Sequence, residues 1–140
     1  MKIKEPFSVF SNIAFLFPLY FSILEKSHLH TFLIAVVFLT SVFFHIIKPY
    51  GAVWWSDIKK LNKFQKITLW KDTIFAVALI LFNLFIFWQK GFPTLFWYAV
   101  IFGLIALYIF FFKTETEKYD FFHGIWHILS GIITLLAVIA

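Results

Sequence analysis

Five long apolar runs, separated by polar connections, constrain the fold of this chain more than any other feature of its sequence. The runs cover residues 7–24, 31–47, 72–88, 92–112 and 121–140. A helix needs roughly 17–25 mostly apolar residues to cross the hydrocarbon core of a bilayer, and each run has that length. Unpaired backbone groups are costly in lipid, so segments of this kind span as helices. The sequence therefore predicts a single all-α transmembrane domain, a bundle of about five helices.

The composition excludes a water-soluble domain. Of the 140 residues, 62% are hydrophobic, 14% are charged and 22 are Phe, whereas soluble domains average about 45–50% apolar and about 25% charged residues. The absence of Cys excludes disulfides, thiolate metal sites and a Cys nucleophile. All 12 basic residues are Lys, which together with the abundant Phe and Ile indicates an AT-rich bacterial genome. The net charge of +5 does not indicate a nucleic-acid partner, because the lysines cluster between the apolar runs.

The positions of the lysines predict the orientation in the membrane. If the helices alternate in direction, ten lysines lie on the side of the N-terminus and two, Lys26 and Lys90, lie on the other side. By the positive-inside rule the N-terminus is cytoplasmic and the C-terminus is outside, which we expect to be across a bacterial inner membrane. In the long connection, every third residue from Ile58 to Ile67 is apolar, with lysines between. This pattern is typical of a short amphipathic helix on the membrane surface.

Polar residues inside the apolar runs are few, and the predicted topology places them at one depth. Ionisable groups within spans are costly and are usually functional. Those expected in the cytoplasmic half, from four different helices, are Glu5, Ser11, Ser41, His45, Asp72, His123 and His127. His28 and His30, at the opposite end, are expected to be solvated loop residues. Solvation at the interface is also the default expectation for Asp57 and Asp120.

Three histidines form a candidate metal site. His123 and His127 are four residues apart and project from one helical face. With His45 they supply three imidazoles and leave a fourth position open, which matches a catalytic zinc rather than a closed structural one. Zinc lowers the pKa of bound water towards about 7 and polarises a carbonyl group. A histidine pair alone has a simpler interpretation, since such side chains also form hydrogen bonds between neighbouring helices.

Candidates for the accompanying catalytic groups lie near these histidines. Ser41 precedes His45 by one turn on the same face, where its hydroxyl can donate a hydrogen bond to the water or to an oxyanion. Asp72, or Asp57 if its loop folds inward, can orient the water and accept its proton.

Three short motifs resemble those of the alkaline ceramidases. The stretch EPFSVFSN at residues 5–12 resembles the opening motif of their first helix, SVFFH at residues 41–45 resembles their Ser-x-x-x-His, and HGIWH at residues 123–127 resembles their His-x-x-Trp-His. The motifs occur in the order found in the family. Alkaline ceramidases belong to the CREST superfamily of membrane hydrolases, with the adiponectin-receptor-like and myomaker-like proteins. The shared pattern of that superfamily is a Ser, an Asp and three His around zinc.

The resemblance implies a zinc-dependent hydrolase that cleaves an amide, or an ester, in a sphingolipid or another acyl-amide lipid. By position it implies the zinc ligands His45, His123 and His127, a Ser and an Asp (Ser41 with Asp72 or Asp57) at the zinc-bound water, and supporting roles for Glu5, Ser11, Asn12 and Trp126. Asp57 follows the motif histidine at a ceramidase-like distance, and Asp72 at a distance more like that of the receptor branch. We favour Asp72, because it belongs to a span and can face the interior of the bundle.

The chain departs from the family pattern in two respects. The family has seven helices, and five are predicted here, so the substrate cavity is expected to be smaller or to be completed by a second copy in a homo-oligomer. Of the acidic calcium-binding segment that precedes the first helix in ceramidases, only Glu5 is present, which argues against calcium dependence. Two alternatives stay open: a haem protein with two of the histidines as axial ligands, and a non-catalytic receptor or assembly protein that uses zinc structurally.

Overall fold

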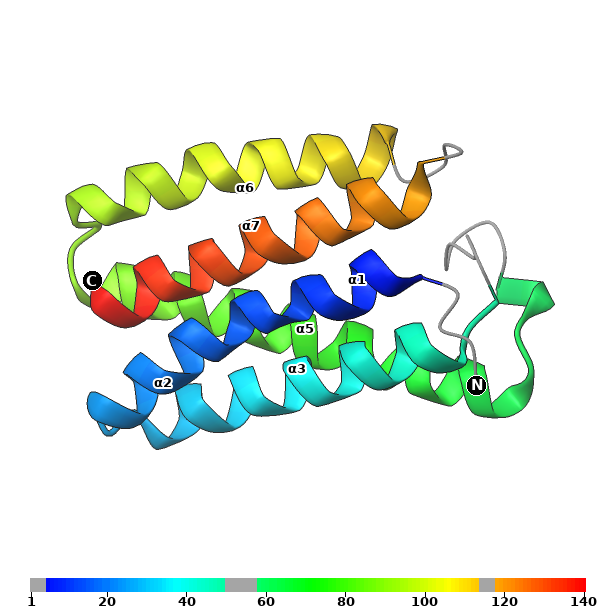
Figure 1. The fold of residues 1–140 in the computed structure, drawn as a ribbon. Coiled ribbons are helices and arrows are strands. Elements are labelled where there is room, and N and C mark those ends of the chain that lie inside the picture. The colour runs from blue at the N-terminus through cyan, green and yellow to red at the C-terminus, as the bar shows by residue number, and fades with distance from the viewer. Residues whose placement is uncertain (1–4, 50–57, 114–117) are drawn as a thin grey trace.

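The computed structural model describes residues 5–49, 58–113 and 118–140, so the candidate acid Asp57 lies outside the described residues. Within these ranges the chain is an all-α bundle with five helical segments long and apolar enough to cross a membrane (Figure 1). The first segment combines α1 (Pro6–Ser11), η1 (Asn12–Phe15) and α2 (Leu16–Leu24), and the others are α3 (His28–Ile47), α5 (Lys63–Gln89), α6 (Thr94–Phe112) and α7 (Tyr119–Ile139). The predicted fold class is confirmed.

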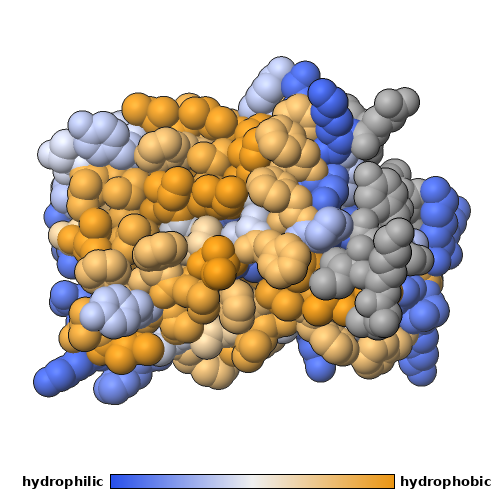
Figure 2. All heavy atoms as spheres, viewed as in Figure 1, coloured by the Kyte–Doolittle hydropathy of each residue, from blue (hydrophilic) through white to orange (hydrophobic). Residues whose placement is uncertain are grey.

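The outer surface of the bundle is apolar over most of its length. Phe10, Leu104 and Phe112 are 64%, 64% and 69% exposed, and Figure 2 shows apolar residues across the middle of one face with hydrophilic residues gathered towards its two ends. Contiguous apolar surface of this extent is rare on soluble monomers. It is compatible with integration into a membrane, where lipid replaces water as the outer solvent.

The first spanning segment is irregular next to its proline. Pro18 has no backbone N–H, so the carbonyl of Ala14 cannot receive the usual helical hydrogen bond from it. The chain passes through the 3-10 segment η1 in the preceding turn before it continues as α2. The irregularity at Pro18 therefore takes the form of a tightened turn that includes Ala14.

Helix α7 packs closely against the first segment through two glycines. Gly124 and Gly131 lie two turns apart on one face of α7. A Cβ atom at Gly124 would overlap the ring of Phe7, and one at Gly131 would lie 2.9 Å from Cβ of Ala14. Small residues allow membrane helices to approach in this way. Helix α7, which also packs along α6 (Figure 1), thereby holds its histidines against the start of α1.

Helix α5 starts earlier than its apolar run indicates. The segment predicted as a separate surface helix is instead a short 3-10 turn, η2 (Ile58–Lys60), followed two residues later by the first turns of α5. The side chain of Asn62 accepts a hydrogen bond from the backbone N–H of Gln65 at 2.9 Å, and the side chain of Gln65 accepts one from the backbone N–H of Asn62 at 3.0 Å. This reciprocal capping starts the helix. Because no Gly or Pro follows before the apolar run, the helix continues into the span without a break.

Helix α3 also begins earlier than predicted, at His28 instead of residue 31. Its first turn is closed by a 2.8 Å hydrogen bond from the backbone N–H of Thr31 to the carbonyl of Ser27. His28 is exposed, as expected, but the prediction for His30 was wrong: it is 2% exposed and lies inside the bundle. The physical reason is a hydrogen-bond partner on α5, Asn83, that satisfies the buried ring.

Candidate metal centre and adjoining cavity

The three predicted ligand histidines meet at one end of the bundle. His45 lies in the last turn of α3, and His123 and His127 lie on successive turns of α7. One nitrogen from each ring lies within 4.8 Å of the others, and Nε2 of His45 is 3.2 Å from Nε2 of His123. A tetrahedral ion with bonds of about 2.0–2.1 Å to nitrogen needs its ligand atoms roughly 3.3 Å apart. The group can therefore bind a metal ion after only small movements of the side chains.

The orientation of His45 is set by Glu5, the residue before α1. Nδ1 of His45 lies 3.1 Å from Oε2 of Glu5, and both side chains are buried. An ionised carboxylate can only accept a hydrogen bond, so Nδ1 carries the hydrogen and Nε2 keeps its lone pair. Carboxylates commonly support metal-binding histidines in this way. Nε2 of His45 is thus the nitrogen that points towards the other two rings.

The orientation of His127 is set by the backbone of α1. Its Nδ1 lies 3.0 Å from the carbonyl oxygen of Ser8 and 3.0 Å from the amide nitrogen of Asn12, so this nitrogen is occupied by the first segment and Nε2 is the nitrogen left for other partners. The amide of Asn12 donates to the same carbonyl at 2.8 Å, and the hydroxyl of Ser11 lies 3.3 Å from Nδ1. Ser11 and Asn12, the Ser-Asn pair of the first motif, therefore both contact the Nδ1 side of the His127 ring.

Asp120, in the first turn of α7, fixes the start of α1. Its carboxylate accepts hydrogen bonds from the backbone N–H groups of Phe7 at 3.0 Å and Ser8 at 2.7 Å, and its carbonyl accepts one from the Ser8 hydroxyl at 3.2 Å. The first N–H groups of a helix lack partners within the helix and favour negative charge. Asp120 is thus a cap that acts between two helices, which corrects the expectation of simple solvation.

Lys48 connects the surroundings of two candidate ligands, and this role was not predicted from the sequence. It is 2% exposed, and its Nζ lies 3.0 Å from Oε2 of Glu5 and donates to the hydroxyl of Tyr119. The ring of Tyr119 stacks on His123 at 5.0 Å. Burial lowers the pKa of Lys48, and the adjacent Glu5 carboxylate opposes that change. In the sequence, Lys48 contributes only to the lysine count that predicts the orientation in the membrane, and no local sequence pattern pairs it with Glu5.

His123 is held chiefly by aromatic rings. It lies between Tyr119 and Trp126, whose ring is 5.6 Å away and roughly parallel to it. Its Nδ1 is buried and has no hydrogen-bond partner among the residues that the structure describes. Trp126, the aromatic member of the third motif, therefore contacts a candidate ligand directly.

Ser41 and Asp72 lie beside an opening next to the histidines. The hydroxyl of Ser41 is 3.5 Å from Nε2 of His127. Asp72, on α5, accepts a 3.4 Å hydrogen bond from the hydroxyl of Thr40. Both Ser41 and Asp72 line the same cavity as His127. The structure thus brings the predicted serine Ser41, the predicted acid Asp72 and the candidate ligand His127 to one cavity.

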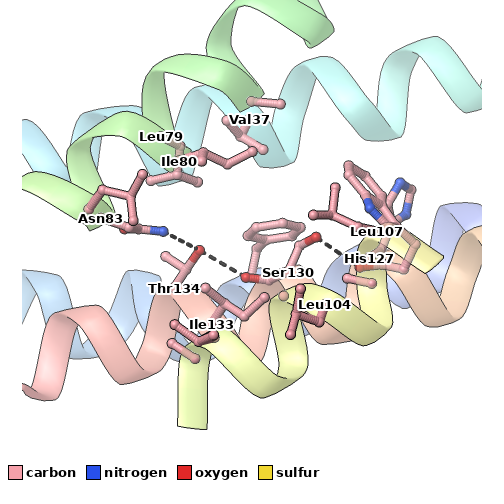
Figure 3. Close-up of a pocket in the computed structure, with 18 of the residues that line it drawn as sticks. Val37, Leu79, Ile80, Asn83, Leu104, Leu107, His127, Ser130, Ile133 and Thr134 are labelled. Atoms are coloured by element: carbon pink, nitrogen blue, oxygen red, sulfur yellow. Dashed lines mark hydrogen bonds between the residues drawn. The ribbon is translucent and has the colours of Figure 1, made fainter. Parts of the chain in front are cut away.

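That space is a cavity of about 340 Å³ between α3, α5, α6 and α7, and its walls are mostly apolar (Figure 3). Its polar end contains Ser41, Asp72 and His127, and it continues to Phe87 near the opposite end of α5. At about 1.5 Å per residue, the stretch from Asp72 to Phe87 is roughly 22 Å long. The hydrocarbon core of a bilayer is about 30 Å thick. The cavity is therefore long enough for one lipid tail.

The cavity opens sideways between α5 and α6. Ile80 and Leu84 of α5 and Leu104 and Leu107 of α6 line it, and the same four residues are 52%, 48%, 64% and 52% exposed. Helix α6 packs mainly on α7 and leaves this seam with α5 largely open. In a membrane, the surface around the seam would face lipid.

No protein-family model matches the chain, and neither a curated protein nor a solved structure is significantly similar to it. The resemblance to the alkaline ceramidases therefore stays a prediction that rests on three short motifs. The geometry of the histidines and the cavity provides the independent basis for a functional argument.

Proposed function

We propose that this protein is a zinc-dependent membrane hydrolase that cleaves an amide, or an ester, in a lipid with water as the nucleophile. The observation that carries the proposal is the convergence of His45, His123 and His127 beside an apolar cavity whose polar end His127 lines. Nδ1 of His45 contacts the Glu5 carboxylate and Nδ1 of His127 contacts the Ser8 carbonyl. Metal-binding histidines commonly have their second nitrogen hydrogen-bonded in this way.

The donor set favours zinc in a catalytic arrangement. Imidazole nitrogens suit zinc, copper, iron and nickel, and the 3.2 Å separation of two of them fits tetrahedral zinc. Structural zinc sites have four protein ligands, whereas three ligands with an open position are typical of catalytic sites. The candidate ligand group of the described residues contains three members, and the Ser41 hydroxyl lies beside it. This arrangement supports hydrolysis over a receptor or assembly protein with structural zinc.

The packing of the rings also favours a single ion over haem. The ring of His45 lies 4.7 Å from that of His123 and 4.9 Å from that of His127, measured between centroids. A haem with two axial histidines must insert its macrocycle between the two ligand rings. These rings are already in contact, so a porphyrin would have to separate α3 from α7.

The side chains around the cavity can be given roles in the reaction. A bound zinc ion would supply a Lewis acid that activates water and polarises the substrate carbonyl. Asp72 accepts the proton of the attacking water, and the hydroxyl of Ser41 donates a hydrogen bond to the carbonyl oxygen. The water oxygen bonds to the acyl carbon, the carbon–nitrogen bond breaks, and the proton held by Asp72 passes to the leaving amine. The products are a fatty acid and an amine.

The lateral opening supports a lipid substrate. A tail can enter from the bilayer between α5 and α6 and lie along the apolar walls, with its carbonyl next to His127. The positive-inside rule places this end of the bundle on the cytoplasmic side. We therefore propose that the substrate is a lipid amide or ester of the cytoplasmic leaflet in a bacterial inner membrane.

The test combines metal content with hydrolysis. Protein purified in detergent without chelator is compared with His123→Ala/His127→Ala by mass spectrometry, and both are incubated with N-palmitoylsphingosine, N-palmitoylethanolamine and a palmitoyl ester. We expect about one zinc per wild-type chain, its loss in the variant, and palmitate release by the wild type only. Zinc without hydrolysis of any of these lipids would indicate a structural role. No transition metal in the wild type would overturn the metal centre.

A further inference from the structure

A second polar cluster lies on the cavity wall, away from the histidines at its polar end. Nε2 of His30 donates to the amide oxygen of Asn83 at 2.8 Å, and the Asn83 amide nitrogen donates to the hydroxyl of Thr134 at 3.1 Å. That hydroxyl in turn donates to the carbonyl of Ser130 at 2.9 Å. The chain of bonds crosses α3, α5 and α7, and Figure 3 shows Asn83 and Thr134 facing each other from α5 and α7.

The amide of Asn83 has hydrogen-bonding capacity that this chain of bonds does not use. The amide nitrogen carries two hydrogens and the amide oxygen has two lone pairs. Within the described ranges, one hydrogen is donated to Thr134 and one lone pair is used by His30. Asn83, Thr134 and Ser130 line the cavity here, and the remaining walls are Leu79, Ile80 and similar apolar residues. An occupant of the cavity is therefore the group able to satisfy the rest of the amide.

Adhesion between helices explains only part of this arrangement. Asn and Thr side chains often join membrane helices through hydrogen bonds, and the contacts with His30 serve that purpose. Adhesion alone does not require the two side chains to line a cavity that also reaches the candidate metal centre. Thr134 lies two turns beyond His127 on the same helix, which places it roughly 10 Å further along the cavity.

We propose that Asn83 and Thr134 form a subsite for a hydroxyl group on the tail of the substrate, an inference that rests on the proposed hydrolase function. The substrate class is an acyl lipid with a hydroxyl near the middle of its chain, roughly 10 Å from the scissile carbonyl. This hydroxyl accepts a hydrogen bond from the remaining hydrogen of the Asn83 amide nitrogen and donates one to the amide oxygen, while the Thr134 hydroxyl holds the amide in place by accepting its other hydrogen. An unsubstituted chain leaves the amide unpaired and binds more weakly.

Binding of two matched fatty acids tests the subsite without requiring hydrolysis. Ricinoleic acid and oleic acid differ by one mid-chain hydroxyl, and each is used to displace a fluorescent polyunsaturated fatty acid from detergent-purified protein. The wild type is expected to bind ricinoleic acid roughly tenfold more tightly than oleic acid, and Asn83→Leu is expected to bind both alike. Thr134→Val, which is nearly isosteric, should reduce the preference if Asn83→Leu does not fold. Thr68→Val is the control, because the Thr68 hydroxyl bonds to the carbonyl of Phe64 in its own helix and Thr68 does not line the cavity.

Three results would overturn the subsite. They are equal affinity of the wild type for the two acids, a preference that survives in Asn83→Leu or Thr134→Val, and a failure of both acids to displace the fluorescent probe. Zinc content is measured on the same samples. Zinc without a preference for the hydroxy acid rejects the subsite alone, whereas a preference without zinc rejects the hydrolase and leaves the binding site in place.

Discussion

The Glu5 carboxylate lies 3.1 Å from Nδ1 of His45, although 40 positions separate the two residues in the sequence. Support of this kind typically changes metal affinity 10–100-fold. We therefore expect Glu5→Ala to weaken zinc binding by roughly that factor, and Glu5→Gln to weaken it less because its amide oxygen still accepts the hydrogen bond. Competition with a chelating dye measures the dissociation constant. Glu25→Ala, at an exposed position, is the control, and equal affinity in Glu5→Ala and the control would contradict the role.

Lys48 should be important for stability as well as for the site. Its ion pair with Glu5 has side chains that are 0% and 1% exposed, and removal of one partner of a buried pair destabilises proteins by about 3–5 kcal/mol. We expect Lys48→Met to lower the midpoint of thermal unfolding in detergent far more than Lys26→Met, which removes an exposed lysine. The double variant Glu5→Gln/Lys48→Met should recover part of the loss. If the losses of stability in the two single variants simply add in the double variant, the ion pair contributes little.

Each candidate zinc ligand should be individually necessary. We expect His45→Ala, His123→Ala and His127→Ala each to lose zinc, because two remaining imidazoles form an incomplete site. His28→Ala, which removes an exposed histidine from the other end of α3, should keep it. Metal content by mass spectrometry after chelator-free purification distinguishes these outcomes. Retention of zinc in any one ligand variant would remove that histidine from the site.

Asp72 should affect the reaction and leave the metal in place. Asp72→Asn keeps the size of the side chain and its contact with Thr40 but cannot accept a proton, so hydrolysis should fall by roughly 10²–10⁴-fold. Zinc content should match that of the wild type. Thr40→Val, which removes the hydroxyl that contacts the carboxylate, should have a smaller effect. Full activity of Asp72→Asn would transfer the role to Asp57 or reject the mechanism.

Gly131 of α7 and Gly103 of α6 give a matched pair of stability tests. A Cβ at Gly131 would meet Ala14 at 2.9 to 3.1 Å, including backbone atoms, whereas one at Gly103 would meet only the end of the Ile133 side chain at 4.0 Å. Gly131→Ala should therefore lower the thermal midpoint. Gly103→Ala should leave it unchanged or raise it, since alanine favours a helix interior by up to about 1 kcal/mol. Similar effects of both substitutions would argue against close packing of α7 on η1.

The sequence contained enough information to predict the spans and the histidine group. Apolar length defines a spanning helix, and alternation of the helices places His45 and the α7 histidines at one end. The burial of His30 could not be predicted in this way, because it depends on Asn83, 53 positions further along the chain. The start of α5 was predictable in principle, since Asn62 and Gln65 have the spacing of a capping box.

The partners around the ligands were harder to predict for the same physical reason. From the sequence, Asp120 is an acid at the membrane interface, and its contact with the start of α1 appears only when α7 packs there. Lys48 is one of the lysines that predict the orientation, and its ion pair with Glu5 appears only in the folded bundle. These contacts arise from packing between distant segments, and no local pattern in the sequence encodes them.

The capping of α1 by Asp120 has a consequence for biogenesis. Helix α7 is synthesised after the other four spanning segments, and it carries both the carboxylate that closes the start of α1 and two of the three candidate ligands. A nascent chain still emerging from the ribosome retains a single candidate ligand, His45, and an uncapped first helix. Binding of an ion by all three candidate ligands therefore requires that α7 has already been inserted beside α1 and α3.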